Sequence, residues 1–151
     1  MRVFRQIALA ASVLCLGAET MAASNKLLVN ATSAVVTLDV FSGRPNPEWT
    51  LTPAMAADLS SRLGTLEATN ETPKPFDGLG YRGMRVELHE QAGTTAVLNI
   101  SHGYATLDQG GQHSRYSDPG RQLESWLTNT GSEHLSADVL RYVMDEIAKS
   151  Q

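Results

Sequence analysis

Two stretches of strictly alternating residues in the second half of the chain constrain the fold most strongly. Residues 84–89 read MRVELH and residues 96–101 read AVLNIS, so that every second side chain is apolar. Successive side chains of a strand point to opposite faces, so each stretch predicts a strand with one buried face. Residues 91–94 predict a hairpin turn between them, and His102-Gly103 predicts a second turn leading into a strand at 104–107. Together these features predict a three-stranded antiparallel meander.

A second pair of strands is predicted near the beginning of the chain. Residues 34–41 (AVVTLDVF) are rich in β-branched residues and alternate, and residues 48–51 (EWTL) resume an extended pattern. The intervening SGRPNP segment contains a glycine, an asparagine and two prolines, which is turn chemistry. These features predict a hairpin.

Three helices are predicted from their starting residues. Thr52, Asp118 and Ser136 each precede a segment with helical periodicity, and a proline follows the first two, where no amide partner is needed. Gly64 is expected to end or loosen the first helix, and Gly131 is expected to end the second. The apolar residues expected on the buried helix faces are Met55, Leu59, Leu63, Leu66, Leu123, Trp126, Leu127, Leu140, Val143, Met144 and Ile147.

The order of these elements indicates the fold class. Two strands, a helix, three strands and two helices form separate runs, which is typical of an α+β fold. We expect a small antiparallel sheet of about five strands, including the three-stranded meander, packed on one face by about three helices. The segments 68–80 and 108–117 are polar and are expected to be loops.

The N-terminus has the three parts of an export signal. Arg2 and Arg5 precede an uncharged apolar run at residues 7–17, and small residues follow. The run is too short to span a bilayer permanently. We expect cleavage after Ala22 or Ala23, with cleavage after position 18 or a buried N-terminal helix as alternatives. The chain is therefore expected to be secreted or periplasmic.

The predicted leader divides the chain into a cleavable signal peptide at 1–23, a flexible lead at 24–33 and a single globular domain at 34–151. The one cysteine, Cys15, leaves with the leader, so the mature domain is expected to contain no disulfide or thiol nucleophile. Lipid modification of Cys15 would require a small residue before it, and Leu14 is there.

The charge of the mature chain argues against binding to nucleic acid. Removal of Arg2, Arg5 and Glu19 leaves 10 basic and 15 acidic residues, a net charge of −5, and the chain contains no basic cluster. Binding to a polyanion requires several phosphates to be neutralised at once. After the leader, no apolar run is long enough for stable membrane insertion.

No cofactor or metal is predicted. Gly78, Gly80 and Gly83 match GxGxxG, but a strand pattern follows them in place of the helix that would face a pyrophosphate, so we interpret them as a flexible lead into that strand. The four histidines, at positions 89, 102, 113 and 134, lack the short spacings of common metal sites.

The least generic segment is residues 42–49 (SGRPNPEW). Pro45 and Pro47 restrict the backbone, so Arg44, Asn46 and Trp49 would be presented on a preorganised loop as candidate ligand- or partner-binding residues. An arginine suits carboxylate or phosphate groups. The alternative is a purely structural connection, in which Arg44 and Asn46 bond the local backbone and Trp49 lies in the core.

Tyr81 and Arg82 are further candidate binding residues, selected by residue type and position. Asp39 is the most distinctive acid, because it lies within a predicted strand. The sequence singles out no catalytic residues and favours a protein without enzymatic activity.

We therefore expect a small exported binding or accessory protein that acts on a protein, a peptide or a small anionic ligand. One alternative is a small secreted hydrolase with dispersed residues such as His102, His113 and Asp108. Another is an inhibitor or immunity-type protein that blocks a partner enzyme with the loop at 42–49.

Overall fold

The structure is a computed structural model that describes residues 31–149 except 77, 92 and 94. The predicted signal peptide and residues 24–30 of the predicted lead lie outside the described residues. Within the described part, one sheet contains all of the strands: β1 (Ala31–Asp39), β2 (Glu48–Leu51), β3 (Glu67–Ala68), β4 (Gly83–Glu90), β5 (Thr95–Ser101), β6 (Tyr104–Gln109) and β7 (Gln112–Ser117). The helical elements are α1 (Pro53–Thr65), the 3-10 turn η1 (Pro119–Arg121), α2 (Gln122–Thr130) and α3 (Ala137–Lys149).

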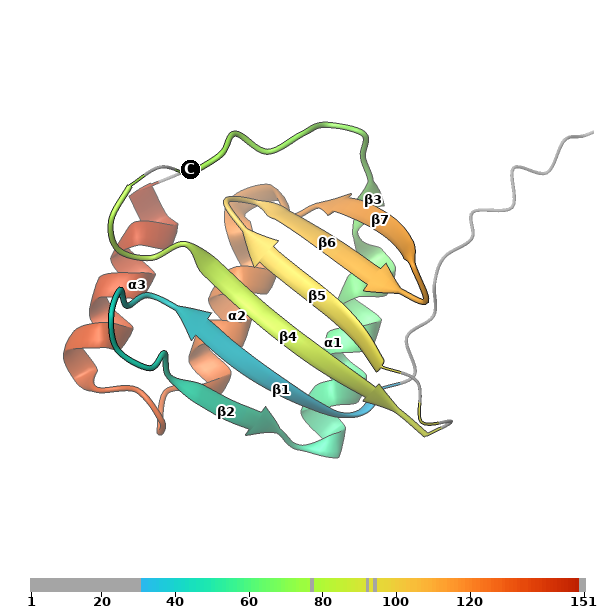
Figure 1. Cartoon of the computed structure of the whole chain (residues 1–151), viewed down its shortest axis with the longest axis horizontal. Helices are drawn as coiled ribbons and strands as arrows, with labels where there is room; N and C mark the ends of the chain where they lie inside the picture. Colours follow the sequence, from blue (N-terminus) through green and yellow to red (C-terminus); the bar gives the residue numbers. More distant parts are fainter. Residues whose placement is uncertain (1–30, 77, 92, 94, 150–151) are drawn as a thin grey trace, which may run out of the picture.

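The sheet has the strand order β2-β1-β4-β5-β6-β7-β3, and every neighbouring pair is antiparallel. The chain leaves β2 at one edge, passes through α1 and reaches β3 at the opposite edge (Figure 1). Residues 69–76 and 78–82 lie along one end of the sheet and lead to β4, which pairs with β1 in the interior. The α+β class is therefore confirmed, and the first hairpin forms as expected.

The expectation of about five strands was too low, because the sheet has seven. The meander contains four strands, β4 to β7, and β7 occupies most of the segment 108–117 that was expected to be a loop. Only Tyr116 of β7 is buried, and both residues of β3 are exposed. Neither strand therefore carries the apolar alternation on which a prediction depends.

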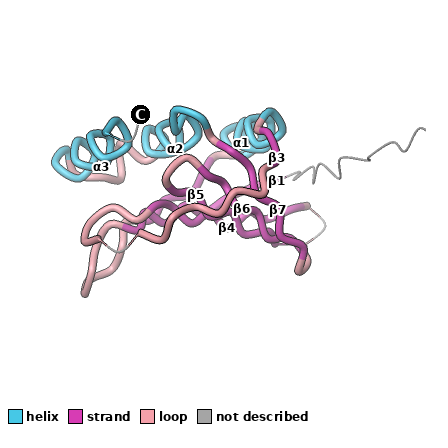
Figure 2. Tube along the Cα trace, turned by 90° about the horizontal axis from the view of Figure 1, so that it is seen from above, coloured by secondary structure: helices cyan, strands magenta, loops and turns pink. Residues whose placement is uncertain are grey.

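All three helices cover the same face of the sheet, as Figure 2 shows. The covered face carries fully buried aliphatic residues of the central strands, such as Val36, Val86 and Leu98, which pack in one core with Leu59 and Leu127 of the helices. The opposite face carries residues that are partly or fully exposed, including Thr37, Arg85, Glu87, Asn99 and Thr106. The alternation in the sequence thus separates a helix-covered face from an open polar face.

Two of the predicted helix starts are confirmed, whereas at the third the 3-10 turn η1 lies between Asp118 and the beginning of α2 at Gln122. The Thr52 hydroxyl accepts a hydrogen bond from the Met55 amide at 3.2 Å, and Ser136 accepts one from the Val139 amide at 3.3 Å. Asp118 caps α2 across the η1 turn, because its carboxylate accepts the Leu123 amide at 3.0 Å. Strand β1 begins three residues earlier than expected, where Ala31 pairs with Glu90. No described helix is long and apolar enough to cross a membrane.

Candidate functional site

The loop between β1 and β2 is closed by the side chain of Asn46. Its Oδ1 accepts hydrogen bonds from the amides of Val40 at 3.1 Å and Phe41 at 2.8 Å, and its Nδ2 donates to Asp39 Oδ1 at 3.1 Å. One amide side chain therefore satisfies two backbone donors and one carboxylate. This arrangement confirms that Asn46 bonds the local backbone, as the structural alternative for this segment expected.

Arg82 ties the same loop to the start of β4. Its Nε donates to Asp39 Oδ2 at 2.9 Å and its Nη2 to Asp39 Oδ1, which is a bidentate ion pair. The guanidinium also donates to the carbonyl oxygen of Phe41 at 2.9 Å and to the Ser42 hydroxyl at 3.2 Å. The hydrogen bond from Arg82 holds the pKa of Asp39 below its usual value, so Asp39 is ionised at neutral pH.

Arg44 is the exposed cation of this loop. It follows Gly43, whose φ of +81° favours glycine, and it is followed by Pro45. Its Cζ lies 3.4 Å from the centroid of the Phe41 ring, which is a cation–π contact. Arg44 has no acidic partner among the described residues. Its guanidinium donors are therefore available to an external acidic group.

Trp49 lies away from this surface, in the core. It is 3% exposed, and its Nε1 donates to the Thr130 hydroxyl at 3.0 Å. Its ring packs against the end of α2, where Gly131 has no side chain to occupy the same space. A partner could reach Trp49 only after the core opened, which leaves residues 42–47 as the accessible part of the segment.

Tyr81 is also 3% exposed and belongs to a buried polar cluster with Arg121 and Glu124. The Tyr81 hydroxyl donates to Glu124 Oε1 at 2.5 Å, and Arg121 donates to both carboxylate oxygens of Glu124 at 2.6 and 2.7 Å. Burial, followed by the charge of Glu124, raises the pKa of Tyr81 far above its usual value. Of the five candidate residues, the structure therefore brings Arg44, Asn46 and Arg82 together at the loop and places Trp49 and Tyr81 inside.

A small notch on the open face of the sheet adjoins this loop. It has a volume of about 130 Å³, and Asp39, Arg82, Arg85, Asn99 and Ser101 contribute to its lining. Gly83 also lines the notch, with a φ of +129°, and a Cβ at this position would lie 2.5 Å from the carbonyl oxygen of residue 100 on the adjacent strand β5. Sequence reasoning missed the notch, because its polar residues lie on three strands and become neighbours only through the sheet register.

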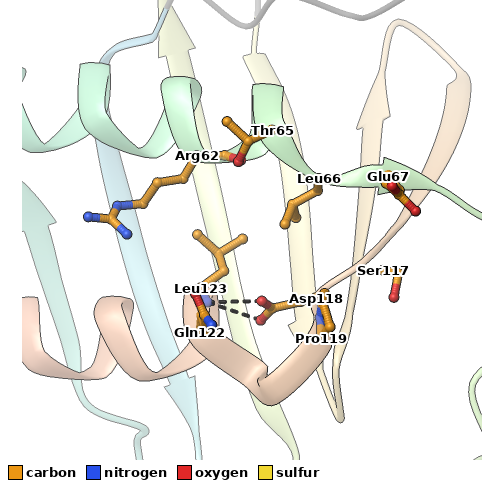
Figure 3. Close-up of a pocket in the computed structure, with 9 residues that line it drawn as sticks. All are labelled: Arg62, Thr65, Leu66, Glu67, Ser117, Asp118, Pro119, Gln122 and Leu123. Carbon is orange, nitrogen blue, oxygen red and sulfur yellow. Dashed lines mark hydrogen bonds between the residues drawn. The ribbon is translucent and has the colours of Figure 1, made fainter.

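A larger hollow of about 340 Å³ lies between the end of α1 and the start of α2 (Figure 3). Two of its charged side chains, Arg62 and Asp118, are engaged elsewhere. The Asp118 carboxylate caps α2. The Arg62 side chain extends away from the other lining residues, with its Cζ 4.7 Å from the centroid of the Trp126 ring and its Nε 3.2 Å from Asp58 Oδ2. This hollow therefore offers less for ligand recognition than the loop surface.

Of the three residues of the hydrolase alternative, the structure brings Asp108 and His113 together but not His102. Asp108 and His113 are cross-strand partners 3.5 Å apart, but their side chains are 43% and 69% exposed on the open face of the sheet. His102 precedes the first residue of β6, whereas Asp108 lies near the end of that strand. No group of three potential metal ligands is found among the residues that the structure describes.

The loop surface formed by residues 42–47 and Arg82 combines an exposed guanidinium with a backbone held by side-chain hydrogen bonds. This arrangement suits recognition of a carboxylate or phosphate group. Comparisons with protein-family models, with curated proteins and with solved structures give no match. Inferences about function therefore depend on the contacts and charges of the molecule itself.

Proposed function

We propose that this protein is an exported, non-catalytic binding or accessory protein whose contact surface is the loop at residues 42–47. The observation that carries the proposal is the exposure of Arg44, without an acidic partner among the described residues, on a loop tied by Asn46 and Arg82. The ligand is an acidic group on a protein, a peptide or a small molecule.

The tied loop favours binding because little of its freedom remains to be lost. Asn46 and Arg82 fix the backbone on both sides of Arg44, and Pro45 and Pro47 restrict it further. Immobilisation of a flexible side chain or loop opposes association, so a preorganised loop retains more of the interaction free energy. The guanidinium then offers two parallel donors to a carboxylate or phosphate.

Export is the second part of the proposal. The apolar run at residues 7–17, flanked by Arg2 and Arg5, supports delivery to the periplasm or the exterior. The partner is then a component of that compartment, and an enzyme blocked by this loop is one form that such a partner would take.

Capture from the exported fraction, with the purified protein immobilised, tests the role of Arg44. Arg44→Ala should weaken retention of the partner by roughly tenfold or more, because a charge-assisted hydrogen bond contributes about 1.5–3 kcal/mol. Arg44→Lys should recover only part of this loss, because lysine lacks the planar pair of donors. The melting temperature should stay close to that of the wild type.

Arg141→Ala is the matched control. Arg141 lies on α3, is 72% exposed and is paired with Asp138 at 2.7 Å. Arg141→Ala therefore changes the net charge by the same amount as Arg44→Ala, but on a different element. Equal capture by the wild type and Arg44→Ala, or equal losses in Arg44→Ala and Arg141→Ala, would contradict the proposal.

Asn46→Ala should lower both capture and the free energy of unfolding, the latter by about 1–2 kcal/mol, because two amides lose their acceptor.

If the captured partner is an enzyme, its inhibition by this protein can be measured directly. Addition of the wild-type protein should lower the activity of that enzyme, and the Arg44→Ala variant should do so only at higher concentration. Unchanged activity at saturating protein would exclude inhibition while leaving capture as evidence for an accessory role.

A further inference from the structure

A second concave surface lies beneath the segment that returns from β3 to β4. It is an open groove of about 620 Å³ lined by residues 71–76, His102 and Tyr104, and its lining is more apolar than polar. In Figure 1 this return segment passes along one end of the sheet. The groove shares no lining residue with the notch beside Arg82. Its volume lies in the range of about 300–1,000 Å³ that is typical of small-molecule sites.

The segment that forms one wall of the groove is fastened at both ends. At one end, the Tyr104 hydroxyl donates to Glu71 Oε2 at 2.9 Å and Arg115 donates to the Glu71 carbonyl oxygen at 2.8 Å. At the other end, the Phe76 and His102 rings stack with centroids 5.1 Å apart and an interplanar angle of 27°. Pro73 and Pro75 restrict the backbone between these ends, so the groove does not depend on a ligand to hold it open.

His102 occupies a turn position that favours asparagine or glycine. It connects β5 to β6 together with Gly103, and both residues have positive φ, +51° and +82°. Two-residue hairpins of this kind favour Asn-Gly, and a bulky residue at the first position costs on the order of 1 kcal/mol or more. The histidine ring lines the groove and stacks on Phe76, which an asparagine side chain would not do.

Lys74 supplies the positive charge of the groove. It is exposed and has no acidic partner among the described residues. The nearest acid in the lining segment, Glu71, is already hydrogen-bonded to Tyr104. The groove therefore combines aromatic and proline surface with one available ammonium group, which complements an apolar ring that carries an acid.

We propose that this groove binds small aromatic acids, with the ring against Phe76, His102 and Tyr104 and the acid group at Lys74. The site is separate from the loop at residues 42–47, and either could exist without the other. It assigns the groove a ligand class that the loop surface does not require.

A pair of fluorescent probes with the same ring system tests this proposal on the purified protein. One is 1-anilinonaphthalene-8-sulfonate, an aromatic acid, and the other is N-phenyl-1-naphthylamine, which lacks the sulfonate. Both should bind, with an increase in fluorescence. Lys74→Gln should weaken binding of the sulfonate by roughly three- to tenfold, as expected for loss of one partly solvated ion pair and hydrogen bond. Binding of the uncharged probe should change by less than about twofold, because its contacts do not involve Lys74.

His102→Asn separates binding from folding. The turn should be at least as stable as in the wild type because asparagine suits its conformation, while loss of the ring should weaken both probes. The matched controls are Lys149→Gln, which removes an exposed lysine paired with Glu146 on α3, and Arg44→Ala, which tests independence from the loop surface. Neither control should change probe binding, and near-ultraviolet circular dichroism should verify that every variant is folded.

The proposal is overturned if neither probe binds, or if Lys74→Gln affects both probes equally. It is also overturned if His102→Asn remains folded and binds both probes as the wild type does. Leu79, which is 89% exposed and follows Phe76 by three residues in the sequence, is the competing apolar contact. Loss of probe binding in Leu79→Ser but not in His102→Asn would assign the probes to that surface and contradict the groove.

Discussion

Single residues in this protein acquire their roles from partners that lie far away in the sequence. Gly131 was expected to end α2, and it does so with an ordinary φ of −93°. It also makes room for the Trp49 ring, since a Cβ at residue 131 would lie 2.7 Å from two ring atoms. The glycine is therefore required by packing across 82 positions of sequence and not by backbone conformation. The helix pattern indicated only the first of these two roles.

Gly131→Ala should lower the free energy of unfolding by about 1–3 kcal/mol, the usual cost of forcing extra volume into a packed region. Denaturant unfolding followed by tryptophan fluorescence measures this change. In a Trp49→Leu background the same substitution should cost much less, because the ring that it meets is gone. Equal costs in the two backgrounds would show that the close approach to Trp49 is unimportant for stability.

At the scale of elements, the cluster of Tyr81, Arg121 and Glu124 joins three segments that the sequence keeps apart. Tyr81 precedes β4, Glu124 lies in the first turn of α2, and Arg121 also donates to the Glu146 carbonyl oxygen near the end of α3 at 3.1 Å. Arg121 accepts a φ of +52° to occupy this position. Removal of one member leaves a buried polar group without its partner. This lowers the free energy of unfolding more than replacement of the whole cluster by apolar residues would.

Tyr81→Phe should lower the free energy of unfolding by about 1–3 kcal/mol near pH 8, because Glu124 loses a buried donor. The pKa of Tyr81 is raised in the folded state, so only the unfolded state releases its proton above the unperturbed pKa of 10.0. The wild type should therefore lose stability as pH rises above that value, by about 1.4 kcal/mol per pH unit from this residue. The stability difference between the wild type and Tyr81→Phe should shrink accordingly.

Denaturant unfolding between pH 8 and pH 11 measures this difference. Tyr116→Phe serves as the control, since it removes the hydroxyl of another largely buried tyrosine, which is 7% exposed and lies in β7. A constant difference between the wild type and Tyr81→Phe across this range would contradict the buried contact with Glu124.

At the scale of the whole molecule, the helices cover one face of the sheet and leave the other face polar (Figure 2). One proposed binding surface is the loop between β1 and β2, which Arg82 ties to the start of β4. The other is the groove beneath residues 71–76, which reaches the turn between β5 and β6. Loops held on a rigid scaffold are where binding residues concentrate. The molecule would thus bind ligands through its connections, with the sheet as their support.

Export also concerns the chain as a whole, and we expect the exported protein to begin at residue 23 or 24. Cleavage is expected after Ala22 or Ala23, because small residues there follow the apolar run. N-terminal sequencing of the protein recovered outside the cytoplasm measures this directly. A start at residue 19 would favour the earlier cleavage site, and a start at Met1 would exclude a cleaved signal.

The sequence by itself determined the features that local periodicity and end chemistry encode. Alternation of period two predicted β4 and β5 and indicated which of their faces is buried, and the hydroxyl and proline at Thr52-Pro53 predicted the start of α1. These signals are local, because a strand or helix buries one face wherever it lies in the molecule. They were sufficient to predict an α+β fold with helices on one face.

Only the tertiary structure decided which distant residues meet. It paired the two residues of β3 with β7 at the far edge, buried Tyr81 against Glu124, and brought His102 beside Phe76 to form the groove. No local pattern marks these contacts, since Glu67 and Ala68 are exposed and the side chains of the buried cluster are polar. These contacts follow from the strand order and from the packing of the helices on the sheet. A polar group that is buried in this packing needs a hydrogen-bond partner, and that partner comes from a segment that is distant in the sequence.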